Sequence, residues 1–287
     1  MKTALVDCLA ARNALTLAWS ATLAKVNKTF LSAEGRAESR GGSSIFSIYR
    51  YKVAKHPIEL PVWEVFRDRA FNVFEAKVEI DRVIETKGLA SSGWQGKFEC
   101  YSCDVEDLAD RFAGKADYIF TDSPYGGYIS YIDLSTLWNA WLGQLPANAV
   151  KERELIVGGE LRLSEQAYID RLGGSIRACT RMLKRDRWLS VVFQHWNVAY
   201  FEAILSSAAQ NGAHLRAAVS QVGDPIWSMH KKKGAASVLG GELILTFYKG
   251  MRETNPLNTS GFDVAERMGD ILAKTNESMV YGEQIFN

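Results

Sequence analysis

The 287-residue sequence has few cysteines, almost no net charge and no long apolar run. The cysteines are too few and too scattered for a disulfide framework, which favours a reducing compartment such as the cytoplasm. A net charge of +1 excludes a global basic field, so any contact with nucleic acid must come from local patches. No apolar segment approaches the ~18–20 residues of a membrane-spanning helix. Asp7 and Arg12 interrupt the apolar start, which predicts an amphipathic helix there and not a signal peptide.

Helical and strand patterns alternate along much of the chain. Residues 3–30 and 62–87 have apolar residues at helical spacing, and Pro61 suits the first turn of the second helix. The side chains that this second pattern predicts as buried are Val62, Val65, Phe66, Phe71, Phe74, Val78 and Ile84. Later segments predict strands at 97–103, 118–120, 188–194, 215–222 and 242–248, and helices at 165–183 and 198–209.

This alternation predicts an α/β fold in three parts. Residues 1–95 form a helical region with a basic and aromatic loop, and residues 96–250 form the α/β part. Residues 251–287 form a C-terminal tail with one amphipathic helix near 262–274.

The stretch Lys115–Leu142 organises the rest. A short apolar run, Tyr118-Ile119-Phe120, stops at the sequence Thr-Asp-Ser-Pro-Tyr-Gly-Gly, and apolar residues then recur at helical spacing up to Leu142. Pro124 restricts its own φ and favours extended geometry at Ser123, while the two glycines permit a sharp turn. Open α/β sheets bind ligands at such places, outside the carboxyl ends of their strands.

The segment Asp122-Ser123-Pro124-Tyr125 resembles the D-P-P-Y signature of amino-group methyltransferases, which use S-adenosylmethionine to methylate exocyclic nitrogens of adenine or cytosine in DNA. The second position departs from the signature, because Ser123 replaces a proline. The resemblance implies a Rossmann-like sheet and S-adenosylmethionine as cofactor. It places Asp122, Ser123, Pro124 and Tyr125 in the catalytic loop. It also implies that Asp104, Asp122 and Gly126 bind the cofactor, with Asp104 beside its adenine.

The chemistry of an exocyclic amine explains these residue types. The lone pair of the amine is delocalised into the ring, which makes the nitrogen a poor nucleophile. A carboxylate and a backbone carbonyl that accept hydrogen bonds from its two N–H groups would aim the lone pair at the methyl donor. Asp122 would supply the carboxylate, and the ring of Tyr125 a face for stacking a flipped-out base. The structural alternative is a tight loop in which Asp122 merely caps the next helix.

Basic side chains elsewhere are candidates for phosphate contact. Tyrosines interleave with basic residues near position 50, a basic run lies between the last two predicted strands, and a histidine ends the strand at 188–194. The side chains predicted to contact nucleic acid are Arg50, Lys52, His195, Lys231, Lys232 and Lys233. Each could instead be an ordinary solvated residue, or for His195 a hydrogen-bonded strand end.

The glycine-rich turn that binds S-adenosylmethionine in this family is missing. No glycine of the chain follows an apolar strand and opens a helix, as such a turn requires. In the family sheet two further strands separate the strands that correspond to 97–103 and 117–122. Because unpaired edges inside a sheet are unfavourable, either a second polypeptide fills this gap or the fold rearranges.

The leading hypothesis is therefore one subunit of a split DNA amino-methyltransferase, with adenine N6 as the favoured target and no membrane association. A second protein subunit would carry the glycine-rich cofactor motif. Two alternatives stay open, an RNA base methyltransferase and a non-catalytic nucleic-acid-binding or scaffold subunit.

Overall fold

The computed structural model describes residues 9–28, 59–88, 99–221 and 242–250. Internal contacts divide the chain into two compact units. The first, called the helical unit, contains residues 1–100 and 130–147, and the second, called the sheet unit, contains residues 101–129 and 148–287. The helix after the predicted signature thus groups with the N-terminal helices. The three-part division at residues 95 and 250 stays a prediction.

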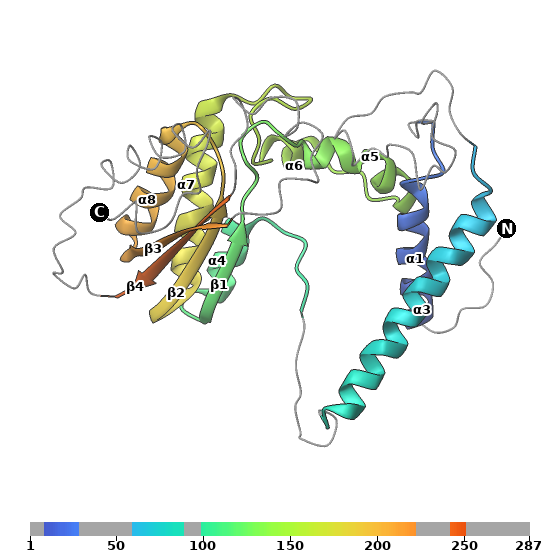
Figure 1. Cartoon of the computed structure of the whole chain (residues 1–287). Coiled ribbons are helices and arrows are strands. Elements are labelled where there is room, and N and C mark those ends of the chain that lie inside the picture. The colour runs from blue at the N-terminus through green and yellow to red at the C-terminus, as the bar shows by residue number, and fades with distance from the viewer. Residues whose placement is uncertain (1–8, 29–58, 89–98, 222–241, 251–287) are drawn as a thin grey trace. The chain divides into compact units, whose positions relative to one another are not determined.

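A mixed four-stranded sheet forms the centre of the sheet unit (Figure 1). Its strands are β1 (Ala116–Asp122), β2 (Leu183–Phe193), β3 (Ala213–Gln221) and β4 (Glu242–Lys249). The spatial order is β1-β2-β4-β3, with β1 parallel to β2 and β4 antiparallel to both of its neighbours. The predicted α/β class, with an incomplete Rossmann-like sheet, is confirmed.

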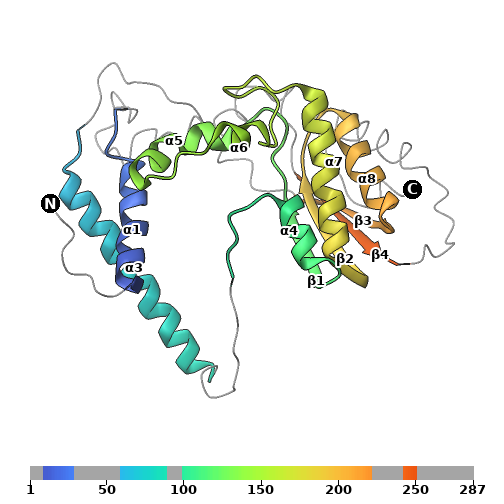
Figure 2. The same ribbon diagram turned by 180° about the vertical axis from the view of Figure 1, so that it is seen from behind.

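Three helices of this unit cover one face of the sheet: α4 (Val105–Phe112), α7 (Glu165–Met182) and α8 (Val198–Gln210) (Figures 1 and 2). Alternate residues of the central strands point towards them, because successive strand side chains lie on opposite faces. The core contains Leu189, Val191 and Phe193 from β2, Leu243, Leu245 and Phe247 from β4, and apolar residues of α7 and α8. A short helix, α6 (Asn148–Glu152), precedes α7.

No described helix covers the opposite face (Figures 1 and 2), and although Ser190 and Val192 of β2 are buried there, the β1 side of that face is exposed. Tyr118 and Phe120 of β1 are 57% and 60% exposed, and Trp188, the partner of Tyr118 in the neighbouring strand, is also exposed. β1 ends the strand order, so one side of its backbone has no strand partner in the described sheet. Parallel strands usually have helices on both faces, so this half of the sheet lacks part of its expected cover.

The strand predicted at 97–103 is wrong in its described part. Residues 99–103 have no strand conformation and lead into α4, whose N-cap is Asp104. A strand needs a hydrogen-bonded neighbour, and the sheet has no position for this segment unless further strands extend it beyond β1. The local apolar pattern therefore did not determine the conformation.

In the helical unit, α1 (Leu9–Leu23), α3 (Val62–Thr86) and α5 (Tyr131–Leu142) pack through aromatic side chains. Trp19 lies edge-on to Phe66 and to Trp141, and the Trp138 indole donates a hydrogen bond of 2.8 Å to the carbonyl of Ser20. The helix predicted at 62–87 is present. Within the described segments, no helix combines the length and the apolar composition needed to cross a bilayer.

The predicted buried side of this helix is wrong, because none of the α3 residues is buried. Phe71 and Phe74, near its middle, are exposed. α3 has 25 residues and α1 has 15, so α1 is too short to cover the whole apolar side of α3. An amphipathic pattern predicts a helix, but burial also requires a neighbour of matching length.

A pair of leucine substitutions tests the position of the core. Leu189→Ala should lower the free energy of unfolding by about 2–5 kcal/mol, because Leu189 is fully buried between the sheet and its helices. Leu161→Ala, at an exposed position of the same unit, should change it by no more than about 0.5 kcal/mol. Denaturant titration followed by circular dichroism measures both, and equal losses would contradict this core.

Candidate active site at the end of strand β1

Asp122 is the last residue of β1, and its side chain is exposed at the carboxyl end of the strand. It pairs in register with Val192 of β2, and the two strands run parallel. The segment that follows β2, which begins at Gln194 and His195, therefore leaves the sheet at the same edge as the loop after Asp122. Two predicted site residues from distant parts of the sequence thus come to one rim.

Tyr125 links this carboxylate to the core. Its hydroxyl donates a hydrogen bond of 2.8 Å to Asp122 Oδ1, and its ring lies edge-on to Phe193 at a centroid distance of 5.5 Å. Burial, and after it the hydrogen bond to Asp122, raises the pKa of Tyr125 above its ordinary value, so the hydroxyl stays a donor. The Tyr125 hydroxyl therefore orients one oxygen of Asp122.

The alternative in which Asp122 caps the next helix does not hold. α5 begins at Tyr131, and the residue at its N-cap position is Ser130, eight positions beyond Asp122. Asp122 instead accepts the Tyr125 hydroxyl, within its own loop. Its second carboxylate oxygen lies on an exposed side chain and can face a ligand.

The backbone of the loop is held from the core side. The hydroxyl of buried Tyr168 on α7 donates to the Pro124 carbonyl at 2.5 Å, and the amide of Gly126 donates to the same oxygen at 3.2 Å. The Gly126 carbonyl accepts the amide of Val157 at 3.2 Å. Ser123, which departs from the D-P-P-Y signature, is buried. These hydrogen bonds fix the backbone of the loop at Pro124 and Gly126.

Gly126 is required at its position for two reasons. Its φ is +66°, which disfavours residues with a side chain, and a Cβ there would lie 2.9 Å from His195 Nε2 and 3.3 Å from the Tyr200 ring. Gly126 was predicted to bind the cofactor, and the structure packs it against these two side chains. Its role towards a cofactor stays a prediction.

His195, predicted to contact nucleic acid, has internal partners. Its ring lies 4.3 Å from the Tyr200 ring and 5.7 Å from the Tyr128 ring, and its Nδ1 accepts the amide of Asn197 at 2.9 Å. Burial lowers the pKa of His195, and the negative charge of Glu165 partly opposes this shift. These contacts favour a neutral imidazole near neutral pH. Contact with DNA stays a prediction.

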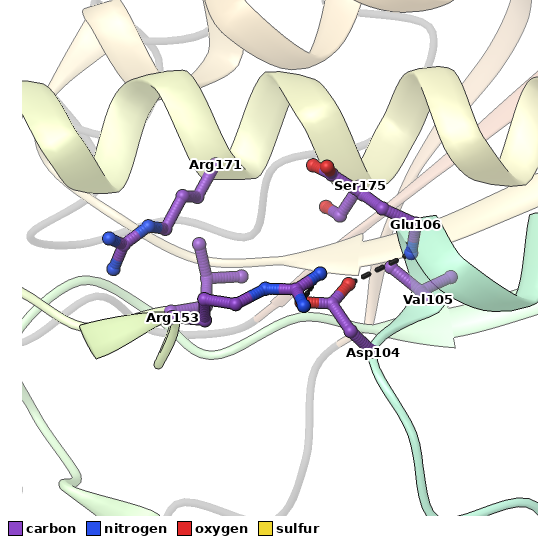
Figure 3. Close-up of a pocket in the computed structure, with 7 residues that line it drawn as sticks. Asp104, Val105, Glu106, Arg153, Arg171 and Ser175 are labelled. Atoms are coloured by element: carbon purple, nitrogen blue, oxygen red, sulfur yellow. Dashed lines mark hydrogen bonds and ion pairs between the residues drawn. The ribbon is translucent and has the colours of Figure 1, made fainter. Parts of the chain in front are cut away.

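Asp104 lies in a separate cavity of about 270 Å³ (Figure 3). One carboxylate oxygen accepts the Glu106 amide at 2.8 Å, which caps α4, and the other forms an ion pair of 2.9 Å with Arg153. Arg171, whose guanidinium donates to the Glu154 carbonyl at 3.0 Å, also lines the cavity. No sequence pattern indicated the two arginines, which stand far from Asp104 in the chain. Asp104 therefore has a structural partner that a ligand would have to share or displace.

The other predicted residues fall outside the described segments. These are Arg50, Lys52, Lys231, Lys232 and Lys233. Within the described segments, no group of three or more histidine, cysteine, aspartate or glutamate side chains is placed to hold a metal ion.

Comparison with known proteins found similarity among solved structures. No family model matches the sequence, and no curated protein matches it. Among solved structures, TTHA0409 from Thermus thermophilus, assigned as a DNA modification methylase, is 15% identical with a TM-score of 0.31. That alignment covers 56% of this chain and 58% of TTHA0409, and the complex of TTHA0409 with S-adenosyl-L-methionine aligns with a TM-score of 0.30 at 15% identity, covering 56% and 59%.

The antibiotic-resistance methyltransferase Kmr is 14% identical with a TM-score of 0.27, over 53% of this chain and 61% of Kmr. The chain thus spans less than two thirds of the length of each of these proteins. At such low TM-scores the likenesses support no inference about function.

Two glycine substitutions separate backbone strain from packing at the loop. Gly114 and Gly126 have nearly the same φ, +63° and +66°, but a Cβ at Gly114 would meet no atom within 4 Å. Gly114→Ala should cost about 1 kcal/mol for the left-handed backbone alone. Gly126→Ala should cost more, because the added methyl must also displace His195. Thermal and denaturant unfolding measure the two losses, and equal values would show that the contact with His195 is not close.

Proposed function

We propose that this chain is the catalytic half of an S-adenosylmethionine-dependent DNA methyltransferase that modifies an exocyclic base amine, with adenine N6 as the favoured target. The observation that carries the proposal is the pairing of Asp122 with Tyr125. An exposed carboxylate ends a parallel strand, and an aromatic hydroxyl beside it holds one of its oxygens at 2.8 Å. A carboxylate whose orientation is fixed by this hydrogen bond can accept an N–H of an amine and position it.

The loop restricts which backbone carbonyl can accept the second N–H of the amine. The Pro124 carbonyl already accepts the Tyr168 hydroxyl and the Gly126 amide, and the Gly126 carbonyl accepts the Val157 amide. Of the carbonyls between Asp122 and Gly127, those of Ser123 and Tyr125 remain the candidates. Asp122 and one of these oxygens would orient the nitrogen lone pair, and Asp122 is placed to take the proton that the methylated nitrogen releases.

Tyr125 would also contact the base. Its ring packs edge-on against Phe193, so the core restrains its orientation while the side chain stays only half-buried. Stacking of an extruded base on such a ring is sequence-tolerant, which agrees with a residue that holds a base and does not read it.

The described residues are suited to line one side of a binding site for S-adenosylmethionine. The cofactor would supply the electrophilic methyl group. The carboxylate of Asp104 can accept an adenine amino group if its ion pair with Arg153 opens, and the loop after Asp122 borders the reacting end. A glycine-rich turn and a carboxylate for the ribose are absent from the described part of the chain. The described residues therefore supply one wall of a cofactor site.

The missing wall would come from a partner polypeptide that carries the glycine-rich turn. Support comes from β1, which ends the strand order and exposes Tyr118 and Phe120 at alternate positions. A strand of the partner that pairs in parallel with β1 would bind the backbone groups that have no strand partner in the described sheet, and a helix after that strand would cover the two rings. The same addition would place the glycine turn beside Asp122, at the carboxyl ends of the strands.

Substitution of Asp122 tests the catalytic role. Asp122→Ala should lower methyl transfer to DNA by ~100-fold or more, since a positioned acceptor is lost from the transition state, while the fold is retained. Asp170→Ala, which removes an exposed carboxylate on α7 of the same unit, is the matched control and should leave the rate unchanged. Transfer of a radiolabelled methyl group by the chain with its partner measures both. Wild-type rates for Asp122→Ala would contradict the assignment, and transfer to RNA alone would favour the RNA alternative.

Cofactor binding by the isolated chain tests the need for a partner. We expect calorimetric titration of the purified chain with S-adenosylmethionine to show no saturable binding at micromolar concentration, because only one wall of the site is present. Circular dichroism of the same sample serves as the control for folding. Micromolar affinity of the isolated chain would contradict the partner proposal without affecting the role of Asp122.

A further inference from the structure

Three side chains that the proposed reaction does not use form one hydrogen-bonded group next to the loop, called here the Glu165 cluster (Glu165, Asn197 and Tyr200). His195 packs on Tyr200 of this cluster and accepts the backbone amide of Asn197. One carboxylate oxygen of Glu165 accepts two hydrogen bonds, from the side-chain amide of Asn197 at 2.7 Å and from the Tyr200 hydroxyl at 2.9 Å. Glu165 is the first residue of α7, and Asn197 caps the start of α8. One carboxylate therefore joins the starts of the two helices that flank the loop.

The contacts of His195 determine its tautomer. The backbone N–H of Asn197 donates to Nδ1 at 2.9 Å, so Nδ1 is unprotonated and the ring hydrogen of the neutral imidazole is on Nε2. The Nε2 edge faces Gly126, where a Cβ would lie 2.9 Å away, and the ring packs on Tyr200 at 4.3 Å. The imidazole fills the space between Gly126 and the Glu165 cluster.

We propose that neutral His195 is a positioning residue that holds the turn at Gly126 and, through it, the pairing of Asp122 with Tyr125. This role depends on the proposed function for its effect on catalysis, but its structural part can be tested separately. Both backbone groups of Gly126 form hydrogen bonds, because its amide donates to the Pro124 carbonyl and its carbonyl accepts the Val157 amide. A ring packed on Gly126 therefore restrains the whole turn, including Tyr125, which directly precedes it.

Protonation should release this restraint. A second ring proton would be placed on Nδ1, where it would face the N–H of Asn197, and two donors cannot form a hydrogen bond. Within the part of the chain that the structure describes, the titratable groups around the ring are the Glu165 carboxylate on α7, the Tyr200 phenol on α8 and the Tyr128 phenol in the loop after β1. Tyr200 stays neutral, because burial and then its hydrogen bond to Glu165 raise its pKa to about 12.

The sign of the pH effect follows from the pKa of His195. Burial lowers that pKa below the ordinary value of 6.5, and the charge of Glu165 opposes the shift only in part. The unfolded or loosened chain therefore binds a proton at higher pH than the native loop does. The restraint is complete above about pH 7 and is lost as the pH falls through the range below 6.5.

Two substitutions distinguish the role of Nδ1 of His195 as a hydrogen-bond acceptor from the role of its ring in packing. In His195→Asn the side-chain oxygen lies near the place of Nδ1, so it can accept the Asn197 amide but cannot be protonated. In His195→Phe a ring remains, but the acceptor is lost. His214→Asn on β3 is the control, because it removes a histidine of the same unit that is distant in sequence and outside the Glu165 cluster.

Hydrogen exchange of the peptide that spans residues 122–129 in the full chain, corrected for intrinsic rates, is the measurement. In wild type and in His214→Asn, exchange should be slow above pH 7 and accelerate about two- to ten-fold as the pH falls below 6.5. His195→Asn should remove this pH dependence, and His195→Phe should give fast exchange at every pH. Wild-type exchange in His195→Phe, or an unchanged pH dependence in His195→Asn, would overturn the proposal.

Kinetics separate this role from the proposed function. If both hold, His195→Phe lowers kcat for methyl transfer with little change in KM for DNA, and His195→Asn flattens the acidic limb of the pH profile. If the exchange results hold but Asp122→Ala leaves the rate unchanged, the positioning of the loop stands and the proposed reaction fails. If Asp122→Ala abolishes transfer but His195→Phe leaves both kcat and exchange unchanged, the positioning role fails and the reaction stands.

Discussion

The hydroxyl of Tyr168 donates a hydrogen bond of 2.5 Å to the carbonyl of Pro124, and this contact joins the core of the sheet unit to the loop that carries Asp122. Tyr168 is fully buried on α7 and packs against Tyr200 of α8, with ring centroids 4.7 Å apart. A buried hydroxyl needs a partner, because an unsatisfied one costs about 1–3 kcal/mol, so the position of the loop and the integrity of the core depend on each other.

The remaining contacts of the loop build on this one. Because the Pro124 carbonyl is held, the turn at Gly126 places Tyr125 against Phe193 and within 2.8 Å of Asp122. His195 closes the other side of the turn, and Glu165 connects it to the starts of α7 and α8. The candidate site is therefore an extension of the packing between two helices and the sheet, which is the kind of support that positioned chemistry requires.

The open edge at β1 is the second constraint. β2 has neighbours on both sides and a face buried under helices, whereas β1 has one described neighbour and exposes Tyr118 and Phe120. Parallel sheets normally have both faces covered, so the exposed rings and the free edge lie together where further structure is expected. The candidate catalytic carboxylate is at the end of this same strand. Completion of the sheet and completion of the site would therefore be a single event.

Much of the architecture could be read from local patterns. The strands at 118–120, 188–194 and 242–248, the described part of the strand at 215–222, and the helices after Pro61 and Asn197 are present, because β-branched and apolar runs and helical spacing are local signals. The strand at 97–103 was wrong and so was the burial of α3, since both depend on neighbours that a local pattern does not contain. The basic residues at 50–52 and 231–233 stay predictions.

The amino-acid sequence by itself determined the residue types of the loop, the strand before it and the need for glycine at a sharp turn, because φ restrictions and strand propensity act within a few residues. Tertiary structure alone decided that the Tyr125 hydroxyl meets Asp122, that Tyr168 holds Pro124, that Arg153 pairs with Asp104 and that His195 packs on Gly126. Except for the first, these contacts join residues far apart in the chain. The contacts of Tyr168 and His195 exist because parallel pairing of β1 with β2 and the packing of α7 and α8 bring these residues to the edge of the sheet where Asp122 lies.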